Sequence, residues 1–267
     1  GKATAEWMIN GHINEDIFNY DIKRFQKFHS ELGFIKKRIT ESLGDLYGMH
    51  WPFKQHKTSR NVKTLPYHDN LKSFGACFGV SGGYERPMWF ALDSEKNEYE
   101  YSYNFQNWYP SVEYETNNTL KNVGLYDLTP FSKFEIKSEK AHQELQKICT
   151  SNVKNEVGNC TYTHMLNKDG GIEADLTIVC LDKNYFRIIS SAATRERDKF
   201  HIKKHISEGI ELKDVTDDYC VFGLFGPKSR LLMQKLTNED LSNENFKFST
   251  SKYLKIDGVQ VWIQRLS

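Results

Sequence analysis

An aspartate in the middle of a predicted strand is the residue whose chemistry most needs an explanation. It is Asp175, within the stretch NKDGGIEADLTIV that covers residues 167–179. A carboxylate can accept or position a proton and can stabilise a cation, yet aspartate is depleted in strands, where it has no local cap to make. The pattern alone favours a solvated or structural carboxylate over a functional one, and it leaves both open.

The strand with Asp175 follows a predicted turn. NKDGG at 167–171 is rich in residues that tolerate positive φ or bond their own backbone. TYTHML before it and IEADLTIVCL after it are typical of strands. Because side chains alternate along a strand, one side is apolar and the other carries Asp175. The apolar side comprises Ile172, Ala174, Leu176, Ile178 and Cys180, and the other comprises Glu173, Asp175, Thr177 and Val179.

The elements around this hairpin mix helices and strands without strict alternation. Helical patterns occur in VEYETNNTLKNVG, in EKAHQELQKICT with Ser138 as the predicted N-cap, in TRERDKFHIKKHI and in PKSRLLMQKL. Strand patterns occur in LYDLTPFSKFEIKS, CTYTHML, IEADLTIVCL, YFRIIS and CVFGLF, and in the hairpin KYLKIDGVQVWIQRL. This order predicts an α+β fold with a mixed, largely antiparallel sheet. No G-x-G-x-x-G follows a strand, so no dinucleotide-binding fold is expected within the chain.

The first hundred residues are less regular. Residues 1–50 are aromatic and charged, with a helical pattern through ITESLGDLYGMHWPF that Pro52 is expected to end. Residues 51–110 are rich in aromatics, glycine and proline and show no sustained period. Such a stretch is either a packed connector or a loop around a ligand, and connectors are commoner.

Composition excludes several classes of function. The chain has 267 residues, 39% of them hydrophobic, and a formal charge of +1, so no overall field favours nucleic acid or an anionic membrane. No run approaches the roughly 20 apolar residues of a membrane span, and the first residues lack a signal-peptide core. The five cysteines are scattered without C-x-x-C, which predicts reduced thiols in a reducing compartment and no metal site.

Several of these stretches resemble a known family in order and spacing. They are VGLYDLTPFSKFEI, TSNV, GNCTYTHMLNKDGGIEADLTIV, IISSAATRERD and GLFGPKSR. They are similar to the folate-binding domain of the aminomethyltransferase family, also called the glycine-cleavage T-protein family. Upstream, LGDLYGMHWPF, SRNVKTLPYHDNLKSFGACFG and YERPMWF resemble the connector between the flavin and folate domains of dimethylglycine and sarcosine dehydrogenases. Together these motifs cover nearly the whole chain.

The resemblance implies an enzyme with two sites. In such an enzyme FAD oxidises an N-methyl amine to an iminium, and tetrahydrofolate at a distant site captures the one-carbon unit. We expect residues 1–50 to end an FAD-dependent oxidoreductase domain, 51–110 to form a central connector and 111–267 to form a C-terminally truncated, aminomethyltransferase-like folate-binding domain. FAD would be bound mainly by a domain before residue 1, and the implied partners are a small N-methyl amine and folate.

The resemblance also assigns candidate site residues. The family's essential carboxylate falls on Asp175, the second position of its usual Asp-Asp pair, while Ala174 fills the first. Asp175 is therefore the expected catalytic residue, which would position a proton at the folate nitrogens and stabilise the iminium.

Four further residues are expected to bind folate. They are Phe131, where the T-protein has a methionine, Tyr162, which lines the pterin pocket in the family, Thr177, on the face of Asp175, and Ser191, where the family has asparagine. Tyr162 could equally be a cross-strand aromatic of the sheet. Serine weakens the pterin contact at residue 191, because a hydroxyl lacks the paired donor and acceptor of an amide.

Two other functions remain open. One is a glycine-cleavage T-protein that acts on an aminomethyl-lipoyl carrier protein without flavin, and the other is a non-enzymatic folate-binding relative. More than a hundred residues precede VGLYDLTPF, which argues against the first, and Asp175 argues against the second. We expect the family's Tyr-x-Gly-Glu glutamate and later arginine beyond residue 267, so the chain alone should bind folate weakly. The bacterial cytoplasm or the mitochondrial matrix is the expected compartment.

Overall fold

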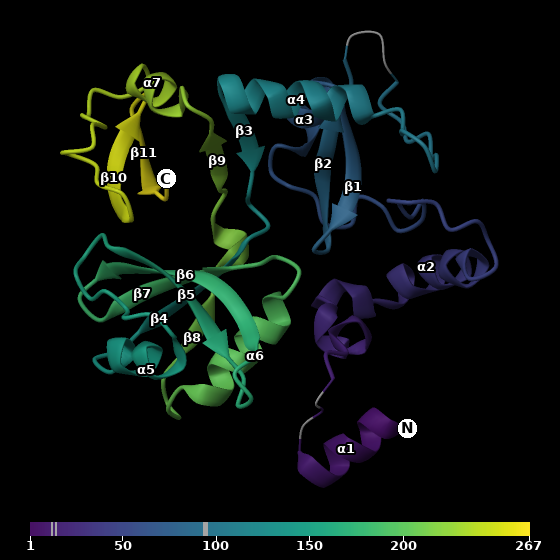
Figure 1. Cartoon of the computed structure of the whole chain (residues 1–267), viewed down its shortest axis with the longest axis horizontal. Helices are drawn as coiled ribbons and strands as arrows, with labels where there is room; N and C mark the ends of the chain where they lie inside the picture. The colour runs from purple at the N-terminus through teal and green to yellow at the C-terminus, as the bar shows by residue number, and fades with distance from the viewer. Residues whose placement is uncertain (12, 14, 93–95) are drawn as a thin grey trace.

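The sheet that carries Asp175 forms the largest unit of the molecule (Figure 1). A computed structural model of the chain describes residues 1–11, 13, 15–92 and 96–267. Helices cover one face of the large sheet, and three two-stranded units lie towards its other side, while the N-terminal helices form an arm beside them (Figure 1). Helices and antiparallel strand pairs together confirm the predicted α+β class.

The N-terminal arm consists of short helices. Its elements are α1 (Lys2–Asn10), the 3₁₀ turns η1 (Phe18–Tyr20), η2 (Ile22–Arg24) and η3 (Lys27–Ser30), and α2 (Leu32–Asp45). The prediction that Pro52 ends this last helix is wrong. The carbonyls of Gly44 and Asp45 accept from the N–H groups three residues ahead, and this tightening closes α2 at Asp45.

One side of α2 is apolar and open to solvent. Leu32, Ile35, Ile39 and Leu43 recur at helical spacing and are between 38% and 72% exposed. In the rest of the described chain nothing packs these side chains away from water, so α2 presents an apolar stripe.

A hairpin occupies the stretch in which the sequence showed no period. It is preceded by α3 (His68–Ser73), consists of β1 (Ala76–Ser81) and β2 (Tyr84–Phe90), and is followed by α4 (Tyr109–Lys121). Gly82 and Gly83 make the turn with φ of 58° and 82°, which favours glycine. A register shift between Cys77 and Phe78 interrupts the alternation along β1, which explains why the period was not apparent.

The large sheet has the strand order β5-β6-β7-β4-β8, with every neighbouring pair antiparallel. Its elements are β4 (Ser132–Lys137), α5 (Ala141–Ile148), β5 (Cys160–Leu166), β6 (Ile172–Asp182), β7 (Tyr185–Ser190), α6 (Arg195–His205) and β8 (Leu212–Asp214). Leu145 of α5 and Ile202 of α6 pack with Phe134, Leu176 and Ile188 in one buried core. Both helices therefore cover the same face of the sheet.

Ser138 is not the N-cap of α5, contrary to the prediction. The helix begins at Ala141 with Lys140 at the cap, and the Ser138 hydroxyl accepts from the N–H of Lys140 before the helix starts. The serine thus closes a turn that leads into the helix.

The remaining elements lie towards the other face of the large sheet. They are β3 (Gly124–Asp127), which pairs with β9 (Phe222–Phe225), then η4 (Thr216–Asp218), α7 (Ser229–Gln234), β10 (Thr250–Ile256) and β11 (Val259–Arg265). The predicted Asp257-Gly258 hairpin turn is confirmed, with φ of 47° and 80°. Gly226, with φ of 107°, lets the chain pass close to the carbonyls of Thr119 and Asn122.

Two general properties complete the description. Among the described residues, no helix combines the length and apolar character that crossing a membrane requires. The structure places all five cysteines as free thiols, of which Cys220 alone is exposed.

Candidate functional site

Asp175 faces away from the core, as the alternation predicted. Its neighbours Ala174 and Leu176 are 3% and 2% exposed and belong to the core beneath α5 and α6, whereas Asp175 is exposed. The carboxylate therefore lies on the face of the large sheet that α5 and α6 leave open, here called the open face.

Tyr162 and His164 lie next to Asp175 on this face. The hydroxyl of Tyr162 donates to Oδ2 of Asp175 over 2.6 Å. The hydroxyl oxygen of Tyr162 also lies 3.3 Å from Nε2 of His164. The two rings meet edge to face with centroids 5.3 Å apart. The hydrogen bond to Asp175 raises the pKa of Tyr162, because the neutral phenol is the donor in it. Three side chains that can hold a proton are thus joined at one hydroxyl.

The strand register places the candidate residues in two neighbouring rows, where a row is a set of residues paired with one another across adjacent strands. Tyr162 pairs with Thr177 across β5 and β6, and His164 pairs with Asp175. Because Ser190 pairs with both Leu176 and Ser132, the next residues along, Ser191 and Phe131, fall in the row of Asp175. With roughly 4.8 Å between strands, that row spans on the order of 10 Å from Asp175 to Phe131.

The candidate residues differ in how open they are. Tyr162 is 58% exposed, Phe131 is 37% exposed, Ser191 is exposed and Thr177 is half-buried. The carbonyl of Ser191 accepts from the hydroxyl of Ser132, which fixes the chain where it leaves β7. Two aromatic rings, a carboxylate and two hydroxyls are thus available to a ligand on the open face.

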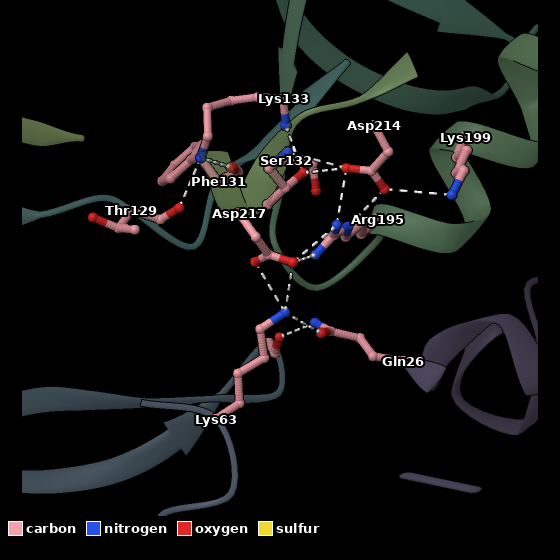
Figure 2. A network of polar contacts seen from close by, with 12 residues as sticks. Gln26, Lys63, Thr129, Phe131, Ser132, Lys133, Arg195, Lys199, Asp214 and Asp217 are labelled. Carbon is pink, nitrogen blue, oxygen red and sulfur yellow. Dashed lines mark hydrogen bonds and ion pairs between the residues drawn. The ribbon is translucent and has the colours of Figure 1, made fainter. Parts of the chain in front are cut away.

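Lys133 belongs to the row of Thr177 but points into the protein. It is 2% exposed, and its Nζ donates to the carbonyls of Thr129 over 2.8 Å and Phe131 over 2.7 Å (Figure 2). Burial lowers the pKa of this ammonium to about 8. Lys133 therefore holds in place the loop that presents Phe131.

The other half of the same face is filled by protein. Arg187 donates to Glu135 through Nε over 3.0 Å and through Nη2 over 2.5 Å, and its guanidinium lies over the rings of Tyr219 and Trp262. Both charged residues are buried, at 4% and 8% exposed. The exposed polar residues Asp175 and Tyr162 lie at the other end of this face.

A cluster of ionic contacts joins this sheet to the segment before it (Figure 2). Arg195 at the start of α6 bonds Asp214 through two nitrogens, over 3.0 and 2.9 Å, and lies 3.5 Å from Asp217. Asp217 in turn contacts Lys63 over 3.1 Å and accepts from the hydroxyl of Tyr84 over 2.9 Å. We call these five residues the ionic junction.

A second group of possible ligands lies at the end of α2 and in the segment that follows it. Glu41, Asp45 and His56 could bring three ligand atoms within 4.8 Å of one another, beside a cavity of about 200 Å³. Glu41 already accepts from the N–H groups of Lys57 and Thr58, and Asp45 pairs with Lys54 over 2.6 Å. These bonds occupy the carboxylates, so the group gives no reason to expect a metal.

His164 and Lys133 were missed by the sequence reasoning, although signals for both existed. In TYTHML the alternation that exposes Tyr162 also exposes His164. In SKFEIK it places Lys133 opposite the apolar residues Phe134 and Ile136. Arg195 and Asp217 carried no comparable signal, because their partners are distant in the sequence.

Two family models match the chain. The GCVT N-terminal domain matches residues 67–267, and the FAD dependent oxidoreductase central domain matches residues 10–64. The matches meet between residues 64 and 67, whereas the boundaries predicted from the sequence lie near 50 and 110, and those boundaries stay a prediction.

Curated relatives are similar over the whole chain. The 4-methylaminobutanoate oxidase (formaldehyde-forming) of Paenarthrobacter nicotinovorans is 34% identical over 269 residues, which are 100% of this chain and 32% of that protein. The mitochondrial dimethylglycine dehydrogenase of Rattus norvegicus is 30% identical over 270 residues, 100% of this chain and 31% of that protein. The chain thus spans about a third of the length of these relatives.

A solved structure supports the fold. The glycine cleavage system aminomethyltransferase T from Bartonella henselae superposes with a TM-score of 0.56 at 20% identity, over 73% of this chain and 48% of that chain. At this identity the likeness concerns the fold.

Proposed function

Because this chain belongs to the family of the GCVT N-terminal domain, we propose that it carries the one-carbon transfer site of an FAD-dependent N-methyl amine dehydrogenase. The amine would be of the dimethylglycine or sarcosine kind, and the acceptor of the carbon would be tetrahydrofolate. The observation that carries the proposal is the exposed carboxylate of Asp175, which receives the hydroxyl of Tyr162 on the open face.

The side chains on the open face suit a reduced folate. Tyr162 and Phe131 offer aromatic faces against which a flat pterin can pack. Thr177 and Ser191 offer hydroxyls, and Asp175 offers an acceptor for an N–H group. Bound there, tetrahydrofolate supplies the nitrogens that capture the carbon.

Asp175 would act on both partners of the transfer. Its negative charge stabilises the cationic iminium carbon as it arrives, and its free lone pairs can accept a proton from a folate nitrogen. The Tyr162 hydroxyl holds the carboxylate in one orientation, so that less ordering remains to be done when the ligands bind.

The N-terminal arm favours a dehydrogenase over a free-standing T-protein. Residues 10–64 match the FAD dependent oxidoreductase central domain, and the apolar stripe on α2 needs a cover. We propose that a flavin-binding domain elsewhere in the complete protein packs on this arm and holds the FAD. Reduced thiols fit the bacterial cytoplasm or the mitochondrial matrix as the compartment.

The decisive experiment separates amine oxidation from carbon transfer in the complete flavin-containing protein. Asp175→Asn conserves size but removes the charge, so oxidation at the flavin should stay near wild type. Carbon transfer should fall roughly 10²–10⁴-fold, the usual worth of general acid–base help. The iminium would then be hydrolysed by water, and formaldehyde would replace methylenetetrahydrofolate as the product.

Glu173→Gln is the matched control. Glu173 lies on the same strand as Asp175, next to the register shift near Leu166. Its backbone carbonyl accepts a hydrogen bond from Arg197 of α6. Burial lowers the pKa of His201 on α6, and the negative charge of Glu173 partly offsets that lowering. Its influence is thus directed to α6, and its substitution should leave both products unchanged. If Asp175→Asn gave a wild-type yield of methylenetetrahydrofolate, Asp175 would be a solvated strand carboxylate without a catalytic role. If the wild type did not use folate, the proposed function would be refuted.

A further inference from the structure

His164 and Asp175 both contact the hydroxyl of Tyr162, so His164 can influence the hydrogen bond that Asp175 receives. It faces Asp175 directly across the strand pair, and Tyr162 precedes it by two residues on the same side of β5. We infer that His164, acting through the Tyr162 hydroxyl, controls whether the carboxylate of Asp175 is free to take a proton. The inference rests on the proposed function and makes His164 a positioning residue for Asp175.

The hydrogens of this trio can be assigned from the distances. The Tyr162 hydroxyl has one hydrogen, and the 2.6 Å contact with the acceptor Asp175 takes it. The 3.3 Å contact then needs a hydrogen from Nε2 of His164. In the resting arrangement Nε2–H donates to the tyrosine oxygen and the tyrosine O–H donates to the carboxylate.

The same geometry can carry a proton in the opposite direction. When Asp175 holds a proton and the His164 ring has passed, by proton exchange with water, to the tautomer with its hydrogen on Nδ1, the Asp175 O–H can donate to the tyrosine oxygen, while the tyrosine O–H turns to the bare Nε2 of His164. A shift of both hydrogens breaks the O–H bonds of Asp175 and Tyr162 and forms one O–H bond on Tyr162 and one N–H bond on His164. The carboxylate is regenerated, the imidazole becomes positive, and no electrons are exchanged.

The stoichiometry of the transfer gives this arrangement a purpose. When a methylene group passes from an iminium to two N–H groups, two protons leave those nitrogens, and the departing amine takes up both. A single carboxylate holds one proton at a time. His164 can hold the first while Asp175 accepts the second, so neither proton needs to escape to water.

The surroundings of His164 leave this exchange undisturbed. Within the described part of the chain, the titratable groups that contact its imidazole are Tyr162 and, through the shared hydroxyl, Asp175. On its other side the Thr150 hydroxyl accepts from the backbone N–H of His164 and brings no charge. The ion pair of Glu144 and Lys147 lies on α5, which covers the opposite face.

The first test uses the pH dependence of coupling in the complete flavin-containing protein. The quantity measured is methylenetetrahydrofolate formed per amine oxidised, between about pH 5.5 and 8.5. In the wild type this ratio should fall as the pH is lowered through this range, because a protonated imidazole can accept no further proton. In His164→Gln it should be about tenfold lower at pH 7.5, which corresponds to about 1.4 kcal/mol, and flat across the range.

A matched histidine and a spectroscopic measurement complete the test. His201→Gln on α6 should keep the wild-type profile. Without any ligand, ¹⁵N NMR of labelled wild-type protein should show the neutral His164 ring with its hydrogen on Nε2. In Asp175→Ala the ring hydrogen should be on Nδ1, because the tyrosine hydrogen then turns to Nε2. A wild-type pH slope in His164→Gln, or an unmoved hydrogen in Asp175→Ala, overturns the inference. If the wild type does not use folate the proposed function fails, whereas the NMR result still decides the hydrogen positions.

Discussion

Lys133 should make the stability of the protein depend on pH in an unusual window. Burial lowers its pKa from 10.5 to about 8 in the folded chain, so between about pH 8 and 10.5 the unfolded chain binds more protons there than the folded chain. The free energy of unfolding therefore rises with pH through this window, and below pH 8 the buried charge is a constant burden. The difference between 10.5 and about 8 corresponds to about 3 kcal/mol.

The measurement compares wild type with Lys133→Met by urea unfolding of residues 1–267 at several pH values from 7 to 10.5. Methionine leaves the carbonyls of Thr129 and Phe131 without their donor, a loss of about 1–3 kcal/mol that is the same at every pH. The free energy of unfolding of the wild type, minus that of Lys133→Met, should therefore increase by about 3 kcal/mol between about pH 8 and 10.5.

The control for this experiment lies on the same strand. Lys137 is exposed at the end of β4, and Lys137→Met should give a difference from wild type that does not change with pH. A Lys133→Met difference that is equally constant from pH 7 to 10.5 would refute the assignment of a buried, easily deprotonated lysine.

Three further results are expected. Cys220 should react with a thiol reagent in the native protein, while Cys180, fully buried beneath the sheet, should react only on unfolding; equal rates by mass spectrometry would contradict this burial. Gly226→Ala should lower the free energy of unfolding by about 2–5 kcal/mol, because a Cβ would lie 2.5 Å from two backbone oxygens at a φ of 107°, and an unchanged melting temperature would be inconsistent with that approach. Arg195→Ala leaves the half-buried Asp214 without its strongest partner and should destabilise the chain by about 1–3 kcal/mol, whereas the exposed Arg230→Ala should have little effect.

Local patterns were enough to predict the strand of the candidate site. The turn at 167–171 and the alternation from Ala174 to Cys180 depend on neighbours in the sequence, and the structure has both as expected. The Asp257-Gly258 hairpin was predictable for the same reason. The identity of Asp175 as a functional residue came from the resemblance, because a strand pattern cannot tell a solvated carboxylate from one that binds a ligand.

The rest depended on contacts between distant segments. That His164 faces Asp175 follows from the β5–β6 register, and that Lys133 caps the Phe131 loop follows from how β4 is buried. The β1–β2 hairpin was missed although Gly82-Gly83 lies between two strand-like runs, because the shift near Cys77 breaks the period. The end of α2 was misplaced because proline was given more weight than the local hydrogen bonds that close the helix.

The ionic junction has a consequence for how the chain assembles as it is synthesised. Lys63 is separated from Asp217 by 154 residues, and Tyr84 is separated from it by 133. At roughly 5–20 residues per second, the early residues wait on the order of ten to thirty seconds before Asp217 exists. During that interval the β1–β2 hairpin, which carries Tyr84, lacks the contacts that later hold it against the sheet. The hairpin should therefore dock only after residue 217 has been made, and a nascent chain halted before that residue should be the form that chaperones bind.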